Sequence, residues 1–157
     1  MKINRNFEKL FIFIGLVFSL QCCSVVENYP SNVQVESKEG TFNYSVKGAG
    51  SGKSIKLSVE NAEKNIFEVI MFRGIVGTDL QIPLVENEVT SRDQNKKFYD
   101  GFFGDKIYRN FITSSVEKLS PSEKVKGGFK TSVKFSINLA ALRVYLEQNK
   151  IIRTFGY

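Results

Sequence analysis

Histidine and tryptophan are absent from this sequence of 157 residues, and cysteine occurs only twice, as the adjacent pair Cys22 and Cys23. Without histidine the chain lacks the commonest general base and the commonest neutral metal ligand. Ser-His-Asp and Cys-His catalytic arrangements are therefore excluded. Long apolar runs are absent as well: the longest, Leu10–Phe18, has about nine residues, whereas a transmembrane helix needs roughly twenty.

The N-terminal residues have the layout of a bacterial lipoprotein signal peptide. A short basic segment (2–9) precedes the apolar run, and Leu20 lies three positions before Cys23. This order is typical of export followed by attachment of lipid to the cysteine that becomes the first mature residue. We predict that residues 1–22 are the signal peptide and that Cys23 is lipidated, which ties the protein to a membrane through its N-terminus.

Cys22 is the second choice for lipidation. Cleavage before Cys22 would leave Gln21 at the last position of the signal, where a small residue is usual, whereas cleavage before Cys23 leaves Cys22 there. With Cys23 as the mature N-terminus no free thiol is left, which excludes a disulfide scaffold and thiol catalysis. The leader removes three basic residues and one acidic residue, so the formal charge falls from +6 to about +4 and favours anionic surfaces only weakly.

The mature chain is expected to contain a tether and one domain. Residues 23–38 are rich in Ser, Asn and Gln and have no hydrophobic period, which indicates a flexible arm. Residues 39–157 are numerous enough for a single domain with its own core. The first strand is expected around Phe42–Val46, where apolar and polar residues alternate.

Glycines at 48, 50 and 52 follow this strand and precede Lys53 and Ser54. A glycine-rich loop before a helix can bind phosphate through its backbone amides. However, Lys47 occupies the position where a Walker-type loop requires glycine. We therefore interpret Gly48–Gly52 as a wide turn.

A buried amphipathic helix is predicted from Ser54 to Arg73, because apolar residues recur there at steps of three and four. Ser54 is a suitable N-cap. The next segment, 78–88, contains Pro83 and is expected to be an irregular loop. Four apolar side chains should hold this loop to the core: Leu80, Ile82, Leu84 and Val85.

An aromatic segment follows, within a region from Arg92 to Tyr108 that is predicted to be helical. Its aromatic residues, which are also the candidate interaction surface, are Phe98, Tyr99, Phe102, Phe103 and Tyr108. Interleaved lysines raise the alternative of base stacking on nucleic acid. We favour a helix that packs on the core with a solvated basic face, and we expect no nucleic-acid partner.

The last part of the chain has the clearest pattern. A strand is expected over Phe111–Leu119 and a turn over Ser120–Glu123. Apolar and polar residues then alternate strictly from Phe129 to Leu139, which predicts a strand with one buried face and one wet, partly basic face. Asn138 should cap a final helix that ends near Asn149.

Antiparallel strands with helices on one face predict an α+β two-layer sandwich with a sheet of about three to four strands. The segment Gly48–Gly74, with its Ser-Gly-Lys and terminal Phe-Arg-Gly-Ile, and the ending Ile137-Asn138-Leu139 resemble a module of the bacterial envelope. That module occurs in lipoproteins similar to penicillin-binding-protein activators, in the curli-secretion lipoprotein and in the N-terminal domain of flagellar assembly protein T. Bacteroidetes-type lipoproteins are similar also around Phe98–Phe103. The resemblance implies an accessory or scaffold protein and brings no catalytic residues.

Acidic residues are the only remaining candidates for catalysis or metal binding. They lie in or near the aromatic segment, at Asp93, Asp100 and Asp105, and in the loop before it, at Glu86 and Glu88. Their spacing does not force two carboxylates together, and it lacks the alternating oxygen ligands of a calcium loop. We expect no enzymatic activity, no metal and no cofactor.

Two functions are consistent with the sequence. The first is an envelope lipoprotein that binds a protein or cell-wall partner. The second is a lipoprotein that binds a small molecule or glycan through the aromatic segment 98–108. Burial of the aromatic side chains would favour the first function, and a shared open cleft would favour the second. No acidic run follows Cys23. The sorting rules of the lipoproteins that this chain resembles then imply the periplasmic side of the outer membrane rather than the cell surface.

Overall fold

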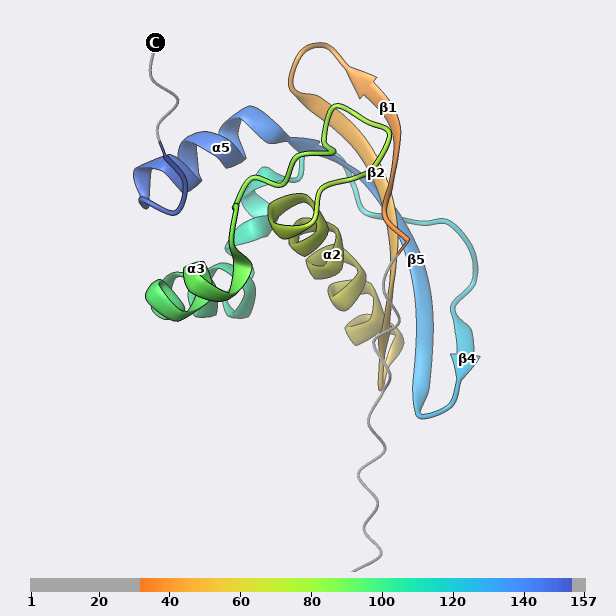
Figure 1. The fold of residues 1–157 in the computed structure, drawn as a ribbon. Coiled ribbons are helices and arrows are strands. Elements are labelled where there is room, and N and C mark those ends of the chain that lie inside the picture. Colours follow the sequence, from red (N-terminus) through yellow and green to blue (C-terminus); the bar gives the residue numbers. More distant parts are fainter. Residues whose placement is uncertain (1–31, 154–157) are drawn as a thin grey trace, which may run out of the picture.

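A five-stranded antiparallel sheet forms one layer of the protein, and the helices lie on one of its faces (Figure 1). The structure, a computed structural model, describes residues 32–153. The strands are β1 (Gln34–Glu39), β2 (Asn43–Gly52), β3 (Glu117–Lys118), β4 (Glu123–Val125) and β5 (Gly128–Asn138). Their order is β1-β2-β5-β3, and β4 also pairs with β5. The predicted α+β fold is confirmed, with five strands where about three to four were expected.

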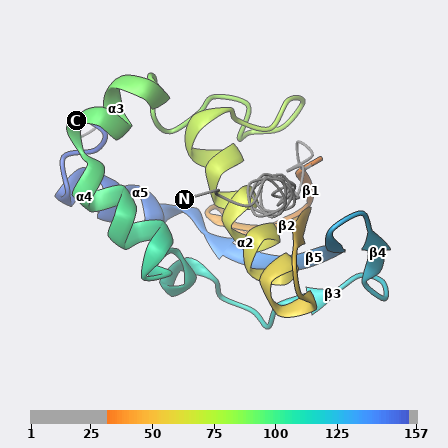
Figure 2. The same ribbon diagram turned by 90° about the horizontal axis from the view of Figure 1, so that it is seen from below.

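The helical layer consists of one long helix and several short ones. They are α2 (Ile55–Phe72), α3 (Glu88–Gln94), α4 (Lys96–Tyr99), the π-helix η1 (Asp100–Gly104), the 3-10 helix η2 (Ile107–Phe111) and α5 (Leu139–Gln148). The view from below shows α2 lying along β2 and β5, with the shorter helices to one side (Figure 2).

Helix α2 forms the centre of the core, as its periodicity predicts. Ser54 caps it by accepting a hydrogen bond from the Leu57 amide at 3.2 Å. Its inward residues Ala62, Ile66 and Ile70 are at most 2% exposed. Helix α2 packs against β2 and against the buried face of β5, where Val133, Phe135 and Ile137 are equally inaccessible. One continuous core therefore joins the two layers.

The glycines at 48, 50 and 52 do not form a turn, and the prediction of a wide turn is wrong. Strand β2 continues through all of them to Gly52 and pairs with β5 along its whole length. A Cβ atom at Gly50 would lie 2.1 Å from the backbone nitrogen of Ala62, and one at Gly52 would lie 2.7 Å from that of Ser58. Glycine at alternate positions of β2 therefore lets the backbone of α2 lie directly on the strand.

The N-terminal boundary of the domain also differs from the prediction. The part of the expected tether from Gln34 to Lys38 is strand β1, so the domain begins before residue 39. Most side chains of β1 are exposed, because it is an edge strand, and so it has no alternating apolar pattern to reveal it. The predicted signal peptide, with Cys22 and Cys23, lies outside the described residues.

The segment between η2 and β4 forms less strand than predicted. Of Phe111–Leu119, only Glu117–Lys118 is a strand, and Ile112 makes a single bridge to Ile137. In the loop after α2, Leu80 and Val85 are buried and Leu84 is half-buried, as expected, but Ile82 is 74% exposed.

The C-terminal elements match the prediction. Strand β5 spans Gly128–Asn138, and its residues alternate between the core and the opposite face. The Asn138 side chain caps α5 by accepting a hydrogen bond from the Ala141 amide at 2.9 Å. Asn149 follows the last residue of the helix.

Candidate functional site

The aromatic segment belongs to the core and not to the surface. Four of the five candidate interaction residues are buried: Tyr99 is 4% exposed, Phe102 0%, Phe103 8% and Tyr108 1%. Phe98 is half-buried and stacks on Phe102 at 5.6 Å between ring centroids. The prediction that these residues form an interaction surface is therefore wrong, and so is the idea that they line an open pocket.

Arg92 closes the outer side of this aromatic cluster. Its guanidinium lies 4.5 Å from the ring centroid of Phe72 and 5.4 Å from those of Tyr99 and Phe103. The same group forms ion pairs with Glu88 at 2.9 Å and Glu68 at 3.2 Å. A ligand therefore has no open ring face to stack on at this side.

Glu63 is a buried carboxylate that sequence reasoning did not single out. It lies in α2 at 3% exposure and accepts hydrogen bonds from Arg109 Nε at 2.7 Å and from the Tyr108 hydroxyl at 3.3 Å. Burial and the negative charge of Glu63 raise the pKa of Tyr108 to about 12. These contacts fasten η2 to α2. Because the carboxylate is enclosed, its role is structural.

The other acidic candidates do not assemble into a site. Glu88 pairs with Arg92, and Asp100 pairs with Lys96 within the same helical segment. Among residues 32–153 no group of three or more His, Cys, Asp or Glu side chains is placed to hold a metal ion. Asp93, Asp105 and Glu86 are exposed.

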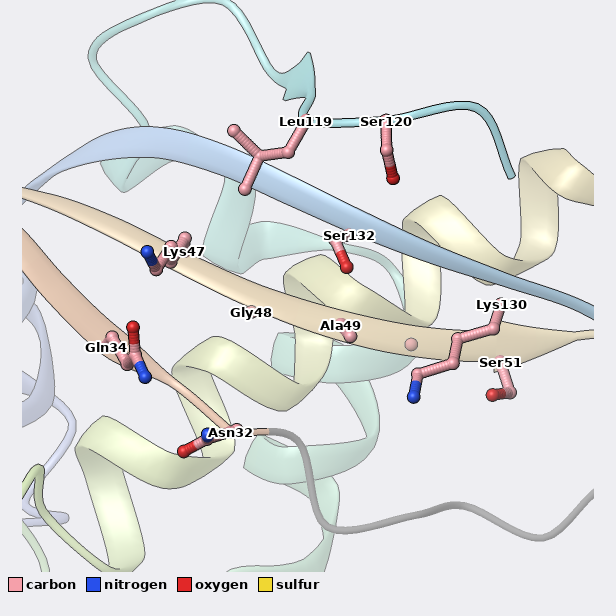
Figure 3. Close-up of a pocket in the computed structure, with 11 residues that line it drawn as sticks. Asn32, Gln34, Lys47, Gly48, Ala49, Ser51, Leu119, Ser120, Lys130 and Ser132 are labelled. Atoms are coloured by element: carbon pink, nitrogen blue, oxygen red, sulfur yellow. The ribbon is translucent and has the colours of Figure 1, made fainter. Parts of the chain in front are cut away.

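The face of the sheet opposite the helices is the best candidate for a functional surface (Figure 1). A hollow of about 420 Å³ opens on it. Figure 3 shows Lys47 and Lys130 at opposite ends of this hollow, with Ala49 and Ser132 between them. The other lining residues are Asn32, Gln34, Gly48, Gly50, Ser51, Leu119 and Ser120.

The lining of this hollow is mixed: most of its side chains carry polar groups, and Leu119 adds an apolar side chain. Its lining offers side-chain amides, hydroxyls and ammonium groups and includes no aromatic ring. Hydrogen-bonding groups of this kind suit the polar surface of a partner better than an apolar ligand. Its floor consists of small residues, so the β2 and β5 backbones are approachable.

Glu36 organises the charges beside the hollow. Its two carboxylate oxygens bind Lys134 at 2.7 Å and Lys47 at 2.9 Å, so one glutamate of β1 links β2 and β5. The ammonium groups of Lys134 and Lys47 hold the pKa of Glu36 below its usual value. Two lysines are thereby kept in fixed positions on the open face.

The sequence pattern predicts part of this surface. Strict alternation in β5 assigns Lys130, Ser132 and Lys134 to a wet, partly basic face, and the structure places them there. Asn32 and Leu119 were not expected, because they come from segments that local pattern does not place beside this face of the sheet. No helix within residues 32–153 is long and apolar enough to span a membrane. Comparison of the chain with protein-family models, curated proteins and solved structures found no match.

Proposed function

We propose that this protein is a lipid-anchored accessory protein of the bacterial cell envelope, attached through Cys23 on the periplasmic side of the outer membrane. Its domain binds a partner protein through the open face of the sheet and does not turn over a substrate. The observation that carries this proposal is the polar, helix-free face of β2 and β5 with its hollow.

Burial of the aromatic segment supports binding of a partner over the alternative of a small-molecule or glycan pocket. The rings that would line such a pocket are packed against one another and against α2, with Phe67 and Phe102 both 0% exposed. Their role is to fill the core behind the sheet. These rings are therefore not available for recognition, which favours the open face of the sheet as the binding surface.

The open face is also rigid, which suits a docking platform. Strands β2 and β5 pair continuously from Asn43↔Asn138 to Gly52↔Phe129. The lysines beside the hollow are fixed by Glu36. Because the backbone of this face is already ordered by strand pairing, a partner that binds it does not incur the entropic penalty of ordering the backbone.

Site-specific photocross-linking in living cells tests this proposal. A photoreactive amino acid would replace Ser132 in the hollow or, as the control, Gln148 on the exposed side of α5. We expect one discrete adduct with a second envelope protein from position 132 and none from position 148. Adducts of the same pattern from both positions, or none from position 132, would contradict the proposal.

A further inference from the structure

Two segments rich in lysine meet at one end of the sheet, where β2 passes into α2 and the β4–β5 hairpin turns (Figure 1). The two segments touch, because a Cβ atom at Gly128 would lie 2.2 Å from the carbonyl oxygen of Gly52. We call this region the basic end. It consists of residues 52–57 and 123–130, and its basic side chains are Lys53, Lys56, Lys124, Lys126 and Lys130.

The basic end contains most of the excess charge of the domain. Residues 32–153 have 19 basic and 14 acidic side chains, a net charge of +5. The basic end contributes five lysines and one acidic residue, Glu123, and so accounts for +4 of that charge. The rest of the described chain is close to neutral. The modest net charge of the domain is therefore concentrated at the basic end.

Folding does not explain this concentration of charge. Among the described residues, Lys53, Lys56, Lys124 and Lys126 form no ion pair, whereas eight of the fourteen basic residues elsewhere pair with carboxylates. The first turn of α2 contains no acidic residue. Lys53 and Lys56 therefore lie at the positive end of the helix dipole, where a cation is unfavourable. The negative charge of an anionic partner would offset this unfavourable interaction between the lysines and the helix dipole.

Apolar side chains accompany the lysines. Ile55 is 43% exposed and Leu57 is 39% exposed, and they alternate along the chain with Lys53 and Lys56. Lysines with neighbouring exposed aliphatic residues are characteristic of segments that lie at the surface of an anionic bilayer. The ammonium groups meet the headgroups while the aliphatic side chains enter the boundary below them.

Strand β1 enters the sheet from the side of the basic end. Gln34 pairs with Lys47, and β1 runs antiparallel to β2, so the chain enters the sheet from the direction of Gly52 and the basic end. Asn32 already lines the hollow together with Ser51. The predicted lipidated residue Cys23 is nine residues before Asn32, a reach of at most about 30 Å.

We propose that the basic end docks on the anionic headgroups of the membrane that holds the lipid anchor, with the strands upright on the bilayer. This inference rests on the proposed attachment through Cys23. In this orientation the open face of the sheet is directed along the membrane, and a partner beside the protein can reach it.

Chemical labelling of lysines on the acylated protein tests the orientation. The lipoprotein is reconstituted into phosphatidylcholine vesicles with or without phosphatidylglycerol, treated with an amine-reactive acetylating reagent and digested for mass spectrometry. Phosphatidylglycerol should reduce labelling of Lys53, Lys56, Lys124 and Lys126 severalfold, and high salt should restore it. Labelling of Lys97 and Lys150, which are exposed at other parts of the fold, should not change.

A pair of variants tests the charges themselves. Lys53→Gln with Lys126→Gln should weaken docking roughly thirtyfold, because each lysine contributes about one factor of five at an anionic surface. Protection of Lys56 and Lys124 should then be lost. The control, Lys97→Gln with Lys150→Gln, removes the same amount of charge elsewhere, and protection of Lys56 and Lys124 should persist in it. Matching thermal unfolding curves for both variants would establish that the fold is intact.

Docking of the basic end and acylation of Cys23 can be refuted separately. Equal labelling with and without phosphatidylglycerol, or protection that also covers Lys97, would overturn the docking even if Cys23 is acylated. Protection of the basic end by an added soluble envelope protein, in place of anionic lipid, would overturn it as well. If mass spectrometry finds no lipid on Cys23, the anchor fails, and docking is then tested by salt-sensitive sedimentation of the protein with phosphatidylglycerol vesicles. Absence of sedimentation would overturn it.

Discussion

Replacing Gly50 by alanine should damage the contact between the two layers more than any other single methyl group added to β2. The new Cβ would lie 2.1 Å from the nitrogen of Ala62 and 2.6 Å from the carbonyl carbon of Asn61. Ordinary van der Waals contacts begin at about 3.4 Å, so α2 must move away from the sheet by more than about 1 Å. Both atoms belong to the helix backbone, which cannot rotate aside like the tip of a side chain.

The expected loss is about 3 kcal/mol, at the upper end of the range for overpacking a core. For a domain of this size, a loss of that magnitude lowers the midpoint of thermal unfolding by roughly 10 °C. Urea denaturation followed by circular dichroism measures the free energy of unfolding directly. Because the transition involves one core, a two-state analysis is appropriate.

Gly104→Ala is the matched control. No atom lies within 4 Å of a Cβ at this position, and Gly104 does not have a positive φ. The variant should be as stable as the wild type, or more stable by a few tenths of a kcal/mol, because alanine loses less conformational freedom on folding. If Gly50→Ala is also within about 0.5 kcal/mol of the wild type, the close approach of α2 to β2 is wrong.

Three further variants test the core and its polar contacts. Phe102→Ala removes a fully buried ring and should lower the free energy of unfolding by about 3–5 kcal/mol in urea denaturation, with loss of the near-ultraviolet aromatic signal. An unchanged free energy of unfolding would contradict the burial of this side chain. Arg109→Met leaves the Glu63 carboxylate enclosed without its cation and should cost about 3 kcal/mol, whereas adding Glu63→Gln should recover part of that loss; equal stability of the single and double variants would show that the ion pair is unimportant. Burial raises the pKa of Tyr108 from 10.0 in the unfolded chain to about 12, so its contribution is complete below pH 10 and is lost as the pH rises to 12. The wild type should therefore lose up to about 3 kcal/mol more than Tyr108→Phe between pH 9 and 12, and identical pH profiles would refute this assignment.

Local sequence pattern predicts the elements that have a strong period and a cap. Helix α2 and strand β5 each show one buried face in the sequence, and Ser54 and Asn138 mark the helix starts by hydrogen bonds that the structure contains. Once these elements are known, an antiparallel α+β arrangement follows from the way their apolar faces must be covered.

Long-range contacts decide the features that were predicted incorrectly. Glycine at alternate positions is compatible with either a turn or a strand, and only the presence of α2 against Gly50 selects the strand. Strand β1 has no buried face of its own and exists because it pairs with β2. Burial of Phe102 similarly depends on Phe67 and Tyr108, which lie in different helical segments.

The candidate site was only partly predictable for the same reason. Alternation along β5 identifies Ser132 as an outward residue, but it does not say which face of the sheet the helices leave open. The basic end is a further case. Its lysines are separated by about 70 residues in the sequence and come together only because the β4–β5 hairpin abuts the start of α2.

Mass spectrometry of the mature protein, purified in detergent from the envelope of the native organism, tests most directly that this domain is held at a membrane by lipid. We predict that Cys23 is the first residue and that its sulfur carries a diacylglyceryl group, which Cys23→Ala should abolish and Cys22→Ser should not. A mature chain that begins elsewhere, or an unmodified Cys23 in a protein that stays soluble, would contradict it.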